Sequence, residues 1–188
     1  MNIDSKEEAS RCLSVAIDDG DAVIRVKGRA SFIIGPTLKQ VGIKLISKSF
    51  KQFIVDMEQC ESADSTFLGV LAGLSMRLKK EHRAKMFLVN LSKKVYESTA
   101  LLGLNQIIDC YLVGNVPDDI INRLKHFSKL ERIEMKRADT KVTYETIAQA
   151  HTNLIQVNKQ NLPRFKDVLS FLKEELKDTE SSKKRLNL

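Results

Sequence analysis

The sequence predicts an α/β fold built on a mixed sheet, followed by a helical tail. Residues 1–115 alternate short β-type runs with helical patterns in the order ββαβαβαβ. Residues 116–188 carry helical patterns alone, and no apolar run is long enough to span a bilayer. We therefore expect a sheet domain over 1–115 and a helical extension over 116–188.

A β-hairpin is expected at the start of the chain. Runs 13–17 and 22–26 flank Asp18-Asp19-Gly20-Asp21, whose Asp-Gly pair is typical of a tight hairpin turn. Gly28 is expected to end the second strand. After a loop that contains Gly35-Pro36, apolar residues recur at helical spacing and predict a surface helix; they are Leu38, Val41, Leu45 and Ile46.

Three further strands and two helices complete the predicted sheet domain. Residues 53–55 read as a buried strand, 58–64 as a polar loop, and the pattern from Leu68 to Leu78 as a helix. The elements expected after that are a strand at 86–89, a helix at 95–102 that ends at Gly103, and a strand at 107–113 closed by Gly114.

The tail is expected to form helices joined by a polar link. Asn115 is a candidate cap for a helix with Pro117 and Asp118-Asp119 in its first turn. After a link at 132–141, two amphipathic helices predict an αα-hairpin that turns at Asn161-Leu162-Pro163, and 177–188 is expected to fray. The two apolar stripes are Tyr144, Ile147, His151, Leu154 and Ile155, and Phe165, Val168, Leu169, Leu172 and Leu176. They must be buried on the sheet domain or on a second copy in a homodimer, and the sequence leaves both open.

Composition excludes several classes of protein. With 43% hydrophobic and 29% charged residues, the chain lies outside the disordered, collagen-like and disulfide-rich ranges. The start MNIDSKEEAS lacks the basic and apolar regions of a secretory signal, so we expect a cytoplasmic protein with no membrane contact. The net charge of +7 is spread thinly, and clusters such as 79–80 and 183–185 lack interleaved aromatic residues, so no direct nucleic-acid binding is expected.

No pattern of catalytic, metal-binding or cofactor-binding residues is present. Cys12, Cys60 and Cys110 form no CxxC pair, which predicts buried, reduced thiols and neither a zinc site nor a disulfide framework. The residues His82, His126 and His151 stand singly, and none of the common nucleotide, metalloprotease or hydrolase motifs occurs. We therefore expect a protein that is not an enzyme and has no catalytic residue, metal or cofactor.

The most unusual segment is 61–70, where an acidic, hydroxyl-rich stretch leads into an apolar helix. On one reading, Asp64 or Ser65 caps the helix by accepting a backbone N–H, and the small Gly69, Ala72 and Gly73 allow close packing of the helix on the sheet. On the other, Ser65 is a phosphorylation site on an exposed helix start, and its phosphate acts as an off-switch for binding. The two readings are compatible.

The same segment carries a family resemblance. The strand Phe53-Ile54-Val55-Asp56-Met57, followed by Ala63-Asp64-Ser65-Thr66-Phe67-Leu68-Gly69-Val70-Leu71 within a ββαβαβαβ frame, resembles the STAS domain of anti-sigma factor antagonists over about residues 11–115. In that family this segment reads D-S-[ST]-G-L-G-V-L or close to it, and its first Ser is the phosphoacceptor, which here is Ser65. Phe67 departs from the pattern, because the family often has Gly there. The tail also resembles a helical extension seen on some bacterial members.

The resemblance implies partner switching in the regulation of transcription. The unphosphorylated antagonist binds an anti-sigma serine kinase and so releases a sigma factor; phosphorylation of Ser65 ends the binding until a serine phosphatase reverses it. The expected partner-binding residues are the loop and first helical turn, with a neighbouring rim placed from the topology: Ser62, Asp64, Ser65, Thr66 and Phe67, and Gly28, Ser31 and Gly35.

Two other hypotheses remain open at this point. In the first, the domain is a STAS-type ligand-sensing module that binds a nucleotide or lipid and signals through the tail helices. A thermal-shift screen in which no such ligand changes the melting temperature would count against it. Nucleic-acid binding rests only on the charge of +7, and absence of gel retardation at every salt concentration would dispose of it.

Overall fold

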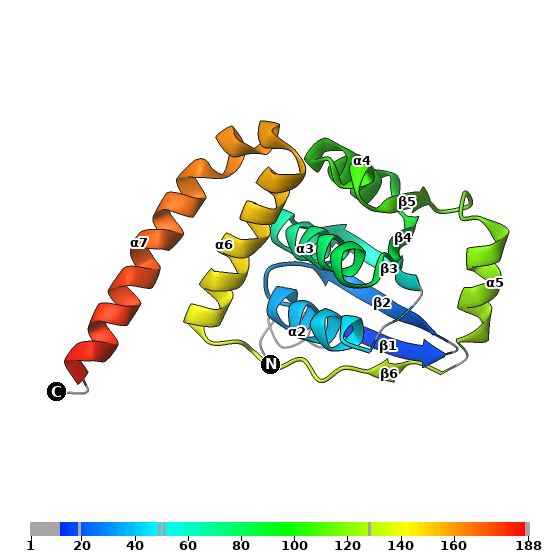
Figure 1. Cartoon of the computed structure of the whole chain (residues 1–188), viewed down its shortest axis with the longest axis horizontal. Coiled ribbons are helices and arrows are strands. Elements are labelled where there is room, and N and C mark those ends of the chain that lie inside the picture. Colours follow the sequence, from blue (N-terminus) through cyan, green and yellow to red (C-terminus); the bar gives the residue numbers. More distant parts are fainter. Residues whose placement is uncertain (1–11, 19, 49, 51, 128, 187–188) are drawn as a thin grey trace, which may run out of the picture.

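A six-stranded mixed sheet forms the centre of the structure (Figure 1). The structure is a computed structural model that describes residues 12–18, 20–48, 50, 52–127 and 129–186, with side chains as far as residue 179. The strand order is β5-β4-β3-β2-β1-β6. The strands are β1 (Cys12–Asp18), β2 (Asp21–Ala30), β3 (Gln52–Ala63), β4 (Lys85–Leu91), β5 (Asp109–Leu112) and β6 (Glu131–Arg132).

The strand directions follow from the connections. β1 and β2 form the predicted antiparallel hairpin, in which Asp18 pairs with Asp21 and Gly20 has a positive φ of 85°; Asp19 of the predicted turn lies outside the described residues. β2, β3, β4 and β5 run parallel to one another because helices connect them. The order ββαβαβαβ is confirmed as far as β5.

The helices cover the two faces of the sheet unequally. Core residues from α2 (Gly35–Ile46), α3 (Ser65–His82) and α4 (Lys93–Leu102) pack with one face in a single large cluster, to which α6 (Thr140–Val157) and α7 (Leu162–Leu186) also contribute. α5 (Asp118–His126) covers part of the other face, in a second cluster that includes Val116, Ile120 and Phe127. Figure 1 shows α6 beside α3, with α7 on the outer side of α6.

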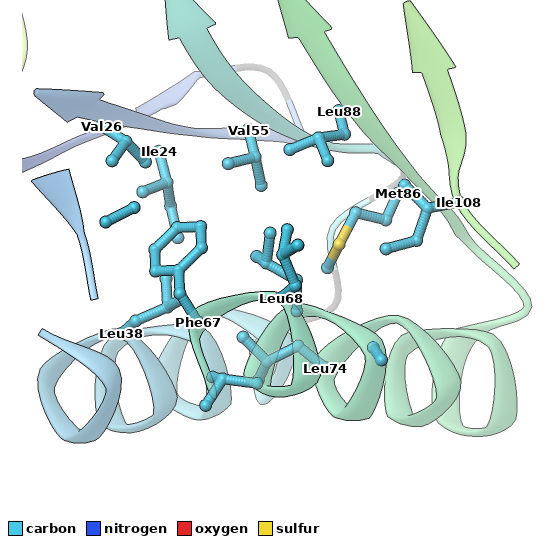
Figure 2. Packing of buried hydrophobic residues seen from close by; sticks show 14 of the residues in the cluster. Ile24, Val26, Leu38, Val55, Phe67, Leu68, Leu74, Met86, Leu88 and Ile108 are labelled. Atoms are coloured by element: carbon cyan, nitrogen blue, oxygen red, sulfur yellow. The ribbon is translucent and has the colours of Figure 1, made fainter. Parts of the chain in front are cut away.

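Large apolar side chains fill the space between the sheet and α3. Phe67, Leu68 and Leu71 on α3 are almost completely buried. In Figure 2, Phe67 and Leu68 point toward Ile24, Val26, Val55 and Leu88 on the strands, with Leu38 and Leu74 on the helix layer. This burial holds the start of α3 at the carboxyl end of β3, where the segment with the family motif lies.

The predicted polar loop at 58–64 is wrong, because β3 continues to Ala63. Its second half pairs with the second half of β2, so that Gly28 lies opposite Cys60 and Ala30 opposite Ala63. Gly28 does not end β2 as predicted: the strand continues through it, with φ at 73° and irregular register on both sides. Glycine tolerates this conformation, so a β-bulge replaces the expected strand end.

The tail also differs from the prediction in three places. β6 adds a short strand to β1, so the region after residue 115 is not helical throughout. Pro117, not Asn115, is the residue before α5, and no side chain caps that helix. α7 continues to Leu186, so residues 177–186 remain helical. The αα-hairpin itself is confirmed, with the 3₁₀ turn η2 (Lys159–Asn161) between its helices.

The three cysteines are free thiols, as expected, but only Cys60 is fully buried. Cys12 and Cys110 are half-buried. Burial raises the pKa of Cys110 to about 12 and also raises the pKa of Cys60, so both thiols stay protonated at neutral pH.

Candidate functional site

Asp64 fixes the start of α3 and the loop beside it. As the helix cap, it accepts the backbone N–H of Phe67 at 2.8 Å through Oδ1, which confirms one of the two predicted capping residues. Its second oxygen, Oδ2, accepts the backbone N–H of Phe32 at 2.7 Å. One carboxylate therefore joins the β2–α2 loop to the first turn of α3.

The ionisation of Asp64 reflects two opposing effects. Burial raises its pKa above the usual value, whereas hydrogen bonds from the backbone N–H groups of Phe67, Phe32 and Thr66 lower it. Burial is the larger effect, because it removes water from the charged form. Asp64 thus serves as a structural acceptor at the helix start, at a half-buried position.

Ser65 is the first residue of α3, and its hydroxyl is in contact with the C-terminal extension. The distance from Ser65 Oγ to His151 Nε2 on α6 is 3.0 Å, a hydrogen bond whose direction depends on the imidazole tautomer. Ser65 is half-buried. The prediction of an exposed helix start is therefore wrong in part, because α6 passes over this turn of α3.

His151 is held between Ser65 and α7. It is buried, and its ring stacks on Phe165 with the centroids 4.3 Å apart and the planes 16° from parallel. Burial lowers the pKa of His151, which favours the neutral imidazole. Among the described residues, its Nδ1 atom is buried without a hydrogen-bond partner. The only polar contact that this ring makes in the described structure is therefore the one to Ser65.

Small residues bring α3 and α6 unusually close together. A Cβ atom added at Gly69 would lie 2.3 Å from the carbonyl oxygen of Ala150, and one at Gly73 would lie 2.2 Å from the amide nitrogen of Asn153. Asn153 Nδ2 donates to the carbonyl oxygen of Gly69 at 3.0 Å. The sequence prediction assigned Gly69 and Gly73 to packing on the sheet; they instead admit α6, while Ala72 lies in the core as expected.

The other predicted partner-binding residues divide into covered and accessible positions. Ser62 and Ser31 are half-buried, and the apolar loop residues Phe32 and Ile33 next to Ser31 are exposed. Thr66, Gly28 and Gly35 are buried, and a Cβ at Gly35 would contact Thr66 and Thr146 of α6.

Phe67 does not belong to a contact surface. Its side chain is fully buried under the sheet (Figure 2), so that only a partly unfolded chain could present it to a partner. Including it among the partner-binding residues was wrong, because this residue, three positions after the cap, turns toward the core.

Sequence reasoning missed His151 and Asn153 as neighbours of this segment. They lie 86 and 84 residues from Ser65 and Gly69 along the chain, and a single histidine or asparagine on a helix carries no pattern. A usable signal existed in the small residues: Gly69 and Gly73 on α3 lie against Ala150 and Asn153 on α6. Such spacing is typical of two helices in close contact.

Two other features of the described surface bear on the alternatives. A groove of about 750 Å³ lies between α2 and residues 133–142. Its lining includes Val15, Val41, Leu45, Lys44 and Lys48. In the described part of the chain, no cluster of three or more His, Cys, Asp or Glu residues could hold a metal ion, and no helix is long and apolar enough to cross a membrane.

Comparison with known proteins identifies the fold around this site. The model of the STAS domain matches residues 13–116, which is more than half of the chain. The chain belongs to the STAS-domain family. The resemblance seen in the sequence is thereby confirmed, and the matched region holds strands β1 to β5 with α2, α3 and α4, and Ser65 at the start of α3. A search of curated proteins found no match.

Solved structures share the fold of the STAS domain. One is a Thermotoga maritima protein described as an anti-sigma factor antagonist, with a TM-score of 0.52, 17% identity, and coverage of 60% of this chain and 94% of that one. An anti-sigma factor antagonist from Mycobacterium paratuberculosis has a TM-score of 0.51 at 22% identity, covering 62% and 95%. The anti-sigma factor antagonist SpoIIAA of Bacillus, in its unphosphorylated form, has a TM-score of 0.50 at 18% identity, covering 62% and 99%.

These matches also delimit what is particular to this chain. Nearly the whole length of each of those proteins is covered, whereas about two fifths of this chain has no counterpart in them. The STAS match ends at residue 116, before α5, β6, α6 and α7. His151 and Asn153, which contact the start and the second turn of α3, therefore lie outside the matched region.

Proposed function

We propose that this protein is an anti-sigma factor antagonist whose STAS domain binds an anti-sigma serine kinase and is inactivated by phosphorylation of Ser65. The observation that carries the proposal is the position of the Ser65 hydroxyl: it is the first residue of α3, directly after the capping Asp64, at the place where the family motif has its phosphoacceptor. The neighbours named as anti-sigma factor antagonists share this fold, which supports the same general role.

The chemistry of this position suits a switch. A phosphoryl group adds about −1.5 to −2 charges at neutral pH. The N-terminus of α3 tolerates an anion, but the carboxylate of Asp64 precedes Ser65 directly and Glu61 lies four residues earlier. A partner surface closed over this turn would have to bury the added charge or expel it. Reversing occupancy from 1:99 to 99:1 takes about 5.5 kcal/mol, a size that a doubly charged group at a closed interface can supply.

The proposal assigns roles to the whole chain. The STAS domain (1–115) binds and itself catalyses nothing, and the extension (116–188) modulates it. Its partners are the kinase and a serine phosphatase. Because sigma factors belong to bacterial transcription, the proposal places the protein in the bacterial cytoplasm. The predicted partner-binding residues that are half-buried, and so not closed off in the core, are then Ser62, Asp64, Ser65 and Ser31 at one end of α3 and the adjoining loop.

Phosphate mapping in the native cell tests the proposal. We expect the full chain to carry one phosphoryl group, located by peptide mass spectrometry at Ser65 and absent in Ser65→Ala. Ser62→Ala and Thr66→Ala are matched controls, since they remove neighbouring hydroxyls; Thr66 is buried and should stay unmodified. In a pull-down, Ser65→Ala should retain an ATPase partner that Ser65→Asp loses. Phosphate that persists undiminished in Ser65→Ala would refute the assignment.

A further inference from the structure

We propose that α6 is a built-in cover for the Ser65 face of α3, and that it must leave this face before Ser65 is phosphorylated or a partner docks there. The inference rests on the proposed function for its biological meaning. The cover itself is a property of this chain, because α6 lies beyond the region matched by the STAS model.

The first argument is the space around the hydroxyl. His151 Nε2 lies 3.0 Å from Ser65 Oγ, which is a hydrogen-bond distance. A phosphorus atom with its three further oxygens does not fit between these two atoms. A catalytic base that accepts the hydroxyl proton must also come within about 2.6–3.2 Å of Oγ, in the shell that His151 already occupies. Phosphoryl transfer and the docked position of His151 therefore exclude each other on this side of Ser65.

The second argument is the extent of the contact. α6 covers α3 over successive turns, from His151 on Ser65 to Asn153 on Gly69 and Gly73. Thr146 of α6 lies close to Gly35, because a Cβ atom added at Gly35 would be 3.5 Å from its methyl group. Five of the eight predicted partner-binding residues thus lie either under α6 or buried in the protein: Ser65, Thr66, Phe67, Gly28 and Gly35. A partner that used Ser65 would compete with α6.

The third argument is that the contact is suited to release. The residues that meet here are small or polar: glycine, alanine, threonine, serine, asparagine and histidine. Leu154 and Phe165 anchor the hairpin more firmly, as does Asn161, which donates to the carbonyl oxygens of Leu102 and Leu154 at 2.9 Å each. The part of α6 that lies over Ser65 holds by hydrogen bonds and close backbone approach, which one added group can disrupt.

The direct experiment places bulk and charge at Ser65 in the full chain. We expect Ser65→Glu to speed deuterium exchange of α6 backbone amides by about tenfold or more, which corresponds to about 1.4 kcal/mol of docking free energy. Ser65→Ala, which removes the hydroxyl but adds no bulk, serves as the control and should change exchange far less. Exchange of α6 in Ser65→Glu that is unchanged or slower than in the wild type would overturn the inference, since it would mean that His151 accommodates the anion.

A second arm opens the cover without touching Ser65. Gly69→Ala inserts a methyl group against the backbone of Ala150, and alanine strengthens α3 itself, so a loosened α6 cannot be ascribed to an unwound α3. Gly42→Ala is the matched control: its Cβ would lie 2.4 Å from Leu74, between α2 and α3, away from α6. Added to native-cell extract with ATP, Gly69→Ala should be phosphorylated at Ser65 several-fold faster than the wild type, and Gly42→Ala should not.

The two arms separate the failure of the inference from that of the proposed function. If no variant is phosphorylated, the proposed function fails, and α6 exchange in Ser65→Glu still decides whether a cover exists. If Gly69→Ala loosens α6 but Ser65 is phosphorylated no faster than in the wild type, the inference fails and the proposed function stands. Faster exchange throughout β3 in Gly69→Ala would signal general unfolding, and Asn153→Ala, which adds no bulk, then replaces it.

Discussion

The two sides of α3 differ in what holds them. The side that faces the sheet presents Phe67 and Leu68, which point toward apolar strand residues (Figure 2), and Leu71; all three are almost completely buried. The side that faces α6 presents Ser65, Gly69 and Gly73. Large apolar side chains stabilise a contact through the area that they remove from water. Small residues stabilise a contact by allowing close backbone approach and a few hydrogen bonds.

This difference separates the contribution of α3 to the core from its contact with α6. The sheet side cannot open without loss of the core, because Phe67, Leu68 and Leu71 are almost completely buried in it. The α6 side is bound through contacts that are individually weak, such as Ser65 to His151 and Asn153 to Gly69. We therefore expect substitutions on the first side to lower the free energy of unfolding of the whole domain, and substitutions on the second to act on α6 alone.

The largest effect is expected for Phe67→Ala. It empties a fully buried site between α3 and the sheet, and such truncations cost about 3–5 kcal/mol in unfolding free energy. Urea unfolding followed by circular dichroism measures it. Phe67→Leu, which keeps most of the volume, should cost less than half as much. A loss below about 1 kcal/mol in Phe67→Ala would mean that the sheet side of α3 is not the stabilising side.

An intermediate and local effect is expected for Asn153→Ala. The substitution removes the Asn153 amide that donates to the Gly69 carbonyl, and a hydrogen bond of this kind contributes about 0.5–1.5 kcal/mol. Hydrogen exchange should show this loss in α6, with β3 and β4 unchanged. Gln156→Ala, an exposed substitution on the same helix, is the control. If hydrogen exchange became faster by the same factor in α6 and in β3, α6 and the core would open together. That result would contradict the difference between the two sides of α3.

The sheet domain was predictable to the extent that local patterns determined it. The Asp-Gly turn, the cap at Asp64 and the end of α4 at Gly103 follow from residues next to each other in sequence. The second half of β3 was not predictable in this way, because residues 58–63 are polar. They form a strand because the bulged part of β2 pairs with them, and that contact is between segments about 32 residues apart.

The candidate site was predictable for only one of its two halves. The motif residues on α3 could be recognised as a continuous segment, and the sequence also showed that the tail stripes required burial. The sequence could not show which surface buries these stripes. The choice of α3 as the surface depends on the match of Gly69 and Gly73 with Ala150 and Asn153, which no single stretch of sequence contains. The contact between Ser65 and His151 is a consequence of that docking.

The smallest expected effect is a loss of stability in mild acid that depends on His151. Burial lowers the pKa of this imidazole below its ordinary value of 6.5, so between the two values the unfolded chain holds a proton that the folded chain lacks. Stability therefore falls as pH decreases from about 7.5 to about 5.5, by at most about 1.4 kcal/mol per pH unit for one proton. The groups against the ring, Ser65 and Phe165, do not titrate in this range.

Urea unfolding at the two pH values, in wild type and in His151→Gln, isolates this contribution. The raised pKa of Asp64 acts in the opposite direction, since its ionised form is disfavoured in the folded state, but it is common to both proteins and cancels in the difference. His126→Gln, at a histidine on α5 far along the chain from the cover, controls for loss of a histidine as such. If the wild type and His151→Gln lose equal stability in acid, the imidazole is as easily protonated when docked as when free. The α6 side of α3 would then be more open to water than its contacts indicate.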